Sequence, residues 1–129
     1  MVFLWACKKE NNTPTASVTD GVDTGAQVKY AASFVNGPYG SLSGKAKILS
    51  KDGKLSLVLD SVAISNGPDL HVYLSKELLP VNFIDLGRLK SVSGTQVYDI
   101  AGMPDIKQYP YALVHCQLFD HLFGSAKLN

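Results

Sequence analysis

The chain has 129 residues, of which 46% are hydrophobic and 18% charged, as is typical of one globular domain. Twelve Lys and Arg against eleven Asp and Glu give a formal net charge of +1, which provides no extended field to hold nucleic acid. These 129 residues contain no apolar run of about eighteen residues, which argues against a membrane-spanning helix.

Residues 1–7 look like the end of a bacterial lipoprotein signal. Met1 to Ala6 are apolar, and Leu4-Trp5-Ala6-Cys7 resembles a lipobox, after which Lys8 begins a polar segment. The resemblance implies that Cys7 is lipidated and becomes the mature N-terminus. We therefore expect a lipid anchor on Cys7 that holds the protein in the cell envelope, on the periplasmic or cell-surface side. The alternative is the frayed apolar N-terminus of a cytosolic protein.

Residues 8–27 are poor in large apolar side chains and rich in Thr, Asn, Asp and Gly. This composition favours open chain, so the segment is predicted to be a flexible stalk. The folded domain is predicted to cover residues 28–129.

The apolar residues alternate with period two from Val28 onward, which predicts β-strands with one buried face. Two alternating stretches, 45–48 and 55–60, flank Asp52-Gly53, a strong hairpin signal. After Asp60 the apolar phase shifts to Val62 and Ile64, as a β-bulge would cause.

A further strand is predicted at 70–75, after the turn at 66–69. Strands around 85–89 and 95–100 follow, then one at 111–119, a turn at 121–124 and a last strand at 125–128. About seven or eight short strands at this spacing predict an all-β domain, an antiparallel β-sandwich or partly open barrel.

The sequence contains no motif that would make the chain a stand-alone enzyme. It has no glycine-rich dinucleotide or phosphate loop, no Cys-x-x-Cys or His-Glu-x-x-His metal site, and no Gly-x-Ser-x-Gly nucleophile elbow. No metal site is predicted, and nothing indicates an oligomeric state.

Cys116 is the most informative residue. If Cys7 is lipidated, Cys116 has no partner for an internal disulfide and is a free thiol, a ligand or part of an intermolecular bridge. Strand alternation places it on the face with Ala112 and Val114, which predicts that it points into the core. It is then either a small packed hydrophobe or a thiol that lines a pocket between the sheets.

The candidate partners of such a thiol are His71, His115, His121 and Met103. Imidazole and thiolate together can ligate haem iron or a transition metal. Against this, His71 lies on the polar side of its strand, and His115 faces away from Cys116. The six tyrosines, Tyr73 among them, could form a binding face or an electron path, but such residues more often pack at the ends of a sheet with the hydroxyl in water.

Three blocks of the chain together resemble the DM-thirteen domain, an electron-transfer module of bacterial lipoproteins. The blocks are Gly44-Lys45-Ala46-Lys47-Ile48 with Leu55 to Leu59, then Gly67-Pro68-Asp69-Leu70-His71-Val72-Tyr73-Leu74-Ser75, and finally Val114 to Phe119 with Phe123 to Leu128. The resemblance implies an extracytoplasmic all-β domain in which Cys116 acts as a bare thiol or binds a prosthetic group such as haem.

The leading hypothesis is a membrane-anchored redox or electron-transfer domain. Cys116 serves as redox thiol or ligand, His71 and Tyr73 help to bind a cofactor of unknown identity, with haem as one possibility, and a redox partner protein exchanges the electrons. The alternative is a non-catalytic cell-surface binding or adhesion module in which Cys116 is structural.

Overall fold

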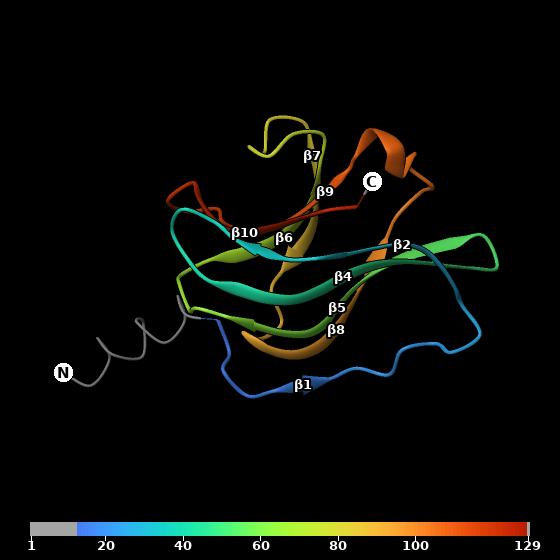
Figure 1. Cartoon of the computed structure of the whole chain (residues 1–129), viewed down its shortest axis with the longest axis horizontal. Coiled ribbons are helices and arrows are strands. Elements are labelled where there is room, and N and C mark those ends of the chain that lie inside the picture. Colours follow the sequence, from blue (N-terminus) through green and yellow to red (C-terminus); the bar gives the residue numbers. More distant parts are fainter. Residues whose placement is uncertain (1–12, 129) are drawn as a thin grey trace.

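The computed structural model describes residues 13–128, which form an all-β domain (Figure 1). Its strands are β1 (Val18–Thr19), β2 (Gln27–Ser33), β3 (Val35–Asn36), β4 (Leu42–Lys51), β5 (Lys54–Ile64), β6 (Leu70–Ser75), β7 (Phe83–Arg88), β8 (Ser93–Ile100), β9 (Tyr111–Cys116) and β10 (His121–Lys127). A short 3-10 helix, η1 (Ile106–Gln108), precedes β9. Within the described residues, no helix has the length and apolar character needed to cross a bilayer.

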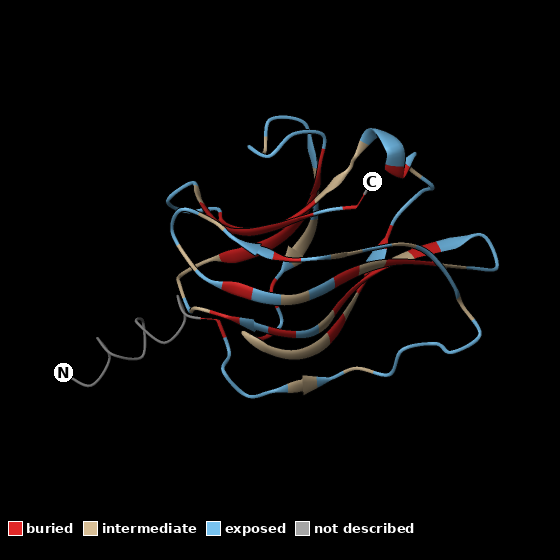
Figure 2. Ribbon diagram, viewed as in Figure 1, coloured by how far each residue is buried: buried red, intermediate tan, exposed pale blue. Residues whose placement is uncertain are grey.

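The strands form two five-stranded sheets that stack face to face, which confirms the predicted β-sandwich (Figure 1). The first sheet has the order β1-β8-β5-β4-β2, and the second has the order β3-β10-β9-β6-β7. All neighbours are antiparallel except β1 and β8. The core lies between the sheets, where both contribute buried stretches (Figure 2), among them Ala46, Ile48, Leu57, Leu59, Leu70, Val72, Leu74 and Val114.

The hairpin of β4 and β5 forms as predicted, with Lys51 paired to Lys54 across the turn. Asp52 has a φ of 52° and Gly53 a φ of 75°. Two consecutive positive φ angles match the twist of the flanking strands, and Asp-Gly supplies them at low steric cost. The local sequence is therefore sufficient to set this register.

The predicted bulge after Asp60 is also present. Leu59 pairs with Gln96 and Val62 with Gly94, so β5 uses one residue more than β8 over this interval. Ser61 takes a φ of 53°, and its N–H donates to the Thr95 hydroxyl, 3.1 Å away. The extra residue returns Val62 and Ile64 to the core after Leu59.

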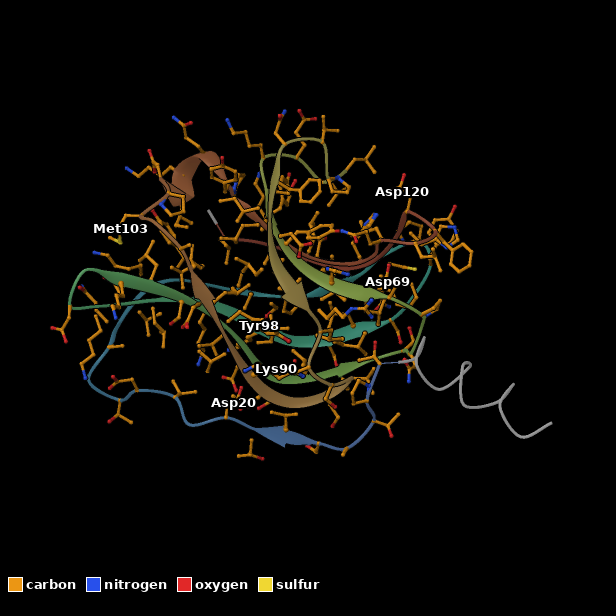
Figure 3. All side chains as sticks on the ribbon, turned by 180° about the vertical axis from the view of Figure 1, so that it is seen from behind. Asp20, Asp69, Lys90, Tyr98, Met103 and Asp120 are labelled. Carbon is orange, nitrogen blue, oxygen red and sulfur yellow. The ribbon has the colours of Figure 1, made fainter. Side chains whose placement is uncertain are left out.

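The described part of the predicted stalk lies along the first sheet instead of standing free. β1 pairs with β8, and Asp20 accepts hydrogen bonds from Lys90 Nζ at 2.7 Å and from the Val97 N–H at 3.0 Å. Figure 3 shows Asp20 beside Lys90. Because short polar side chains hydrogen-bond to backbone as readily as they favour open chain, the composition of this segment did not reveal the contact. Residues 1–12, which include Cys7, lie outside the described residues.

The C-terminal hairpin differs from the prediction. The turn lies at residues 117–120, where Asp120 takes a φ of 56°, whereas the predicted turn residues 121–124 belong to β10. Gly124 suggested a turn, but its role is close packing, since a Cβ at this position would overlap the side chain of Leu42 on the facing sheet. The strand from Tyr111 therefore ends at Cys116.

Tyr98 lies on the core side of β8 and is 5% exposed. Its hydroxyl donates to Gln96 Oε1 at 2.5 Å and accepts from the Lys90 N–H at 2.9 Å. Gln96 is itself fully buried, and its amide donates to the Ser91 carbonyl at 2.6 Å. We expect Tyr98→Phe to lower the free energy of unfolding by about 1–3 kcal/mol at pH 7, because Gln96 Oε1 and the Lys90 N–H lose their partner. Urea unfolding measures the change.

The same variant tests how the free energy of unfolding depends on pH in the alkaline range. Burial raises the pKa of Tyr98 to about 12, so the fold favours the neutral phenol. Its contribution is complete below the pKa of the unfolded chain, about 10, and is lost as pH rises from there toward 12. We expect the stability gap between wild type and Tyr98→Phe to shrink by about 1.4 kcal/mol per pH unit in this window. A gap that stays constant would contradict this assignment, since the variant retains all other titrating groups.

Candidate functional site

Cys116 lies at the end of β9, on the core side of the second sheet, and is 1% exposed. Its Sγ donates a hydrogen bond to the Pro68 carbonyl, 2.9 Å away, and the next N–H, that of Gln117, donates to the Asp69 carbonyl at 3.0 Å. The two bonds fasten the Gly67-Pro68-Asp69 turn to β9. Cys116 is a free thiol among the described residues.

A haem does not fit at Cys116. The sulfur is enclosed by the main core, which includes Leu70, Val72 and Val114. Among residues 13–128, its one hydrogen-bond partner is the Pro68 carbonyl. A porphyrin on the sulfur would have to occupy volume that these packed side chains fill.

His71 and Tyr73 lie on the other side of the same sheet. The alternation of β6 sends Leu70, Val72 and Leu74 into the core, and its pairing with β9 sets His71 opposite His115 and Tyr73 opposite Leu113. We call this side the outer face and define it by His71, Tyr73, Leu113, His115 and Leu122. The structure thus brings His71 and Tyr73 together but separates both from Cys116 by the thickness of the sheet.

The outer face is buried, although period-two alternation suggested that it was solvated. Every residue of β6 is buried, with Tyr73 at 1% exposure and His71 at 9%. Tyr73, Leu113 and Leu122 form a second apolar cluster, and Phe83 of β7 packs on Tyr73 with ring centroids 4.3 Å apart. Aromatic and aliphatic side chains from distant segments therefore cover this face.

His71 is held between two carboxylates. Its Nδ1 lies 3.1 Å from both oxygens of Asp85, and its Nε2 lies 3.1 Å from Asp69 Oδ1. Arg88 Nη2 approaches the same Asp69 oxygen at 3.3 Å. Because carboxylates only accept, both ring nitrogens donate when the imidazole carries two protons. Asp69 reaches this position with a φ of 57°, a backbone conformation that Asp tolerates.

Tyr73 lies beside both histidines of the outer face. Its ring centroid is 6.1 Å from that of His71 and 5.7 Å from that of His115. The hydroxyl accepts a hydrogen bond from Gln117 Nε2 at 3.0 Å. Burial raises the pKa of Tyr73 above its ordinary value, and the Asp85 carboxylate acts in the same direction, while the Gln117 hydrogen bond opposes the rise. The phenol therefore stays neutral at physiological pH.

His115 is 2% exposed, and its Nε2 lies 2.8 Å from Asp120 Oδ1. Its Nδ1 is the one buried side-chain nitrogen or oxygen between residues 13 and 128 that has no hydrogen-bond partner. Figure 3 shows Asp120 and Asp69 at the same end of the molecule. His115 was a weak candidate in the sequence because its neighbour Cys116 faces the other way, and Asp85, Asp120 and Gln117 carried no signal there. Of these contacts, the sequence could indicate that between Asp69 and His71, since residues i and i+2 of a strand share a face.

A family model described as electron transfer DM13 matches residues 33–128. The chain belongs to this family. The match includes Cys116 and every residue of the outer face, which confirms the family resemblance seen in the three sequence blocks. No curated protein and no solved structure matches the chain. The family therefore suggests an electron-transfer role, and the assignment of individual residues rests on the geometry.

Proposed function

We propose that this chain is an electron-transfer domain of the bacterial cell envelope whose redox-active group binds at the outer face, beside His71 and Tyr73. The DM13 match supports the electron-transfer role. The observation that carries the location is the burial of Tyr73 at 1% exposure among histidines and carboxylates. Clusters of buried titratable groups of this kind are typical of functional sites. A redox partner protein in the envelope would donate or accept the electrons.

The proposal gives Cys116 a packing role. Its thiol is bonded to the Pro68 carbonyl inside the core, away from the outer-face groups. The hypothesis that Cys116 itself is the redox thiol stays a prediction, and one experiment separates the two. The full chain is isolated from the bacterium that produces it and is adsorbed on an electrode, with Cys116→Ala and Tyr73→Phe alongside.

We expect a reversible voltammetric wave in wild type and in Cys116→Ala. The wave should shift or weaken in Tyr73→Phe, which loses the hydroxyl that Gln117 contacts. A wave lost only in Cys116→Ala would transfer the redox role to the thiol. Absence of a wave from all three proteins would overturn the electron-transfer proposal.

The membrane anchor is part of the proposal and rests on the lipobox-like Leu4-Trp5-Ala6-Cys7. We expect Cys7→Ala to abolish labelling by radioactive palmitate and to release the protein from the membrane fraction, because a thioether-linked lipid needs the Cys7 sulfur. Cys116→Ala is the matched control and should keep both the label and the membrane association. Palmitate label on Cys7→Ala would show that the lipid is attached at another residue and would overturn the assignment to Cys7.

A second candidate function, a surface binding module, is favoured by exposed apolar side chains in residues 78–81 and in the turn at residues 117–120, two segments that meet at one pocket. Leu78, Leu79 and Val81 are 46%, 65% and 66% exposed, and Leu118 and Phe119 are 61% and 57% exposed. Exposed apolar groups that gather in this way commonly mark an interaction surface. This candidate predicts a protein without a voltammetric wave.

A further inference from the structure

A pocket of about 320 Å³ opens on the outer face, between residues 78–81 and the turn that follows β9. Most of its walls are apolar, with contributions from Tyr39, Leu79, Pro80, Val81 and Leu122. The remaining lining includes His115 and Asp120. The volume is at the small end of ligand pockets and suits a molecule of one or two rings.

The protonation pattern of His115 determines which polar group such a molecule needs. Asp120 Oδ1, a pure acceptor, lies 2.8 Å from Nε2, so Nε2 carries the hydrogen. In the neutral imidazole Nδ1 then has no hydrogen and presents a lone pair. This atom is buried and without a partner in the described chain, although the residue that bears it lines the pocket. A buried acceptor in this state is destabilising, and a bound donor would recover the lost hydrogen bond.

We propose that this pocket binds a hydroxylated aromatic molecule whose hydroxyl donates to His115 Nδ1. The apolar walls take the ring, and the imidazole takes the hydroxyl hydrogen. A carboxylate-bearing ligand is disfavoured, because it offers no donor at neutral pH and would meet the Asp120 charge. The inference rests on the proposed function for the ligand's use, since hydroquinones are the redox-active members of this class. It places that ligand at the His115 side of the outer face.

The test compares 2-naphthol with 2-methoxynaphthalene, which has the same ring system but no donor. Each is titrated into the full chain and followed by NMR. We expect 2-naphthol to bind at least about tenfold more tightly than 2-methoxynaphthalene, because the methoxy compound leaves Nδ1 unpaired. The ¹⁵N signal of His115 Nδ1 should move from its free lone-pair position on addition of 2-naphthol and stay unchanged with the methoxy compound.

Four variants make the result specific. His115→Phe keeps a ring in place and should abolish the preference between the two compounds. If it fails to fold, Asp120→Gly serves instead, because residue 120 has a φ of 56° and glycine accepts it, while loss of the carboxylate frees Nε2 and reduces the preference. Val81→Asp, in the pocket wall, should weaken the binding of both compounds. Met103→Asp, at the far end of the molecule, should leave the binding of both unchanged (Figure 3).

Equal affinities for the two naphthalenes, or an unchanged Nδ1 signal, would overturn the proposal. Because naphthol binding is measured without electron transfer, the two proposals can fail separately. Binding by a protein that shows no voltammetric wave would retain the pocket and remove its redox use. A voltammetric wave from a protein that does not bind 2-naphthol would retain the electron-transfer role and remove the pocket proposal.

Discussion

Replacement of His71 by Leu is expected to lower the free energy of unfolding by about 3 kcal/mol at neutral pH. The imidazole is the shared partner of Asp69 and Asp85, whose side chains are 18% and 36% exposed. Without it, two carboxylates face an apolar side chain at the edge of a buried surface. The loss is not larger, because Asp69 keeps Arg88 and Asp85 keeps the Gly87 N–H. Urea unfolding at pH 7 gives the value.

The cause of that loss is tested by removing the two charges as well. The triple variant His71→Leu, Asp69→Asn, Asp85→Asn should recover most of the stability, since Asn keeps the shape of both side chains and tolerates the φ of 57° at residue 69. His121→Leu is the matched control. His121 stacks on Tyr39 with ring centroids 3.7 Å apart and has no carboxylate partner among the described residues. Replacement of His121 should therefore lower the free energy of unfolding by much less than replacement of His71. Equal losses at the two histidines would contradict the explanation by the carboxylates that His71 contacts.

Local sequence signals account for much of the fold. Asp52-Gly53 supplies two positive φ angles, and the apolar phase shift after Asp60 marks a bulge, so both features follow from neighbours in the chain. Gly124 shows where local signals mislead, because a glycine that permits close packing has the same signature as one that permits a turn. The partner that distinguishes the two cases, Leu42, lies on the other sheet.

The site was less predictable than the fold. His71 and Tyr73 were candidates because they lie in one distinctive block, and that block also contains Asp69. Alternation, however, indicated that their side of the strand was solvated. The covering groups come from β7, from residues 78–81 and from the turn between β9 and β10. Asp85 meets His71 only through the pairing of β6 with β7. Such contacts depend on strand order, which periodicity does not contain.

Replacement of Gly124 by Val is expected to destabilise the domain by about 3 kcal/mol. Gly124 pairs with Val114 on one side and Asn36 on the other, and it is buried against β4 of the facing sheet. A Cβ there overlaps the side chain of Leu42, which is 2% exposed. The variant must separate the sheets or force Leu42 from its rotamer, and urea unfolding would record either outcome as a lower midpoint.

A double-mutant cycle with Leu42→Ala identifies the overlap as the cause. Leu42→Ala alone should cost about 2–5 kcal/mol, because it leaves a cavity between the sheets. In the double variant the methyl groups introduced by Gly124→Val occupy part of that cavity, so the combined loss should be clearly smaller than the sum of the two single losses. Additive losses would mean that the introduced side chain acts through its own strand and not through Leu42. Leu42 lies in the first sheet, and Gly124 lies in the second sheet, which carries the outer face. A strong coupling between the two substitutions would therefore also show that the packing between the sheets holds the site in place.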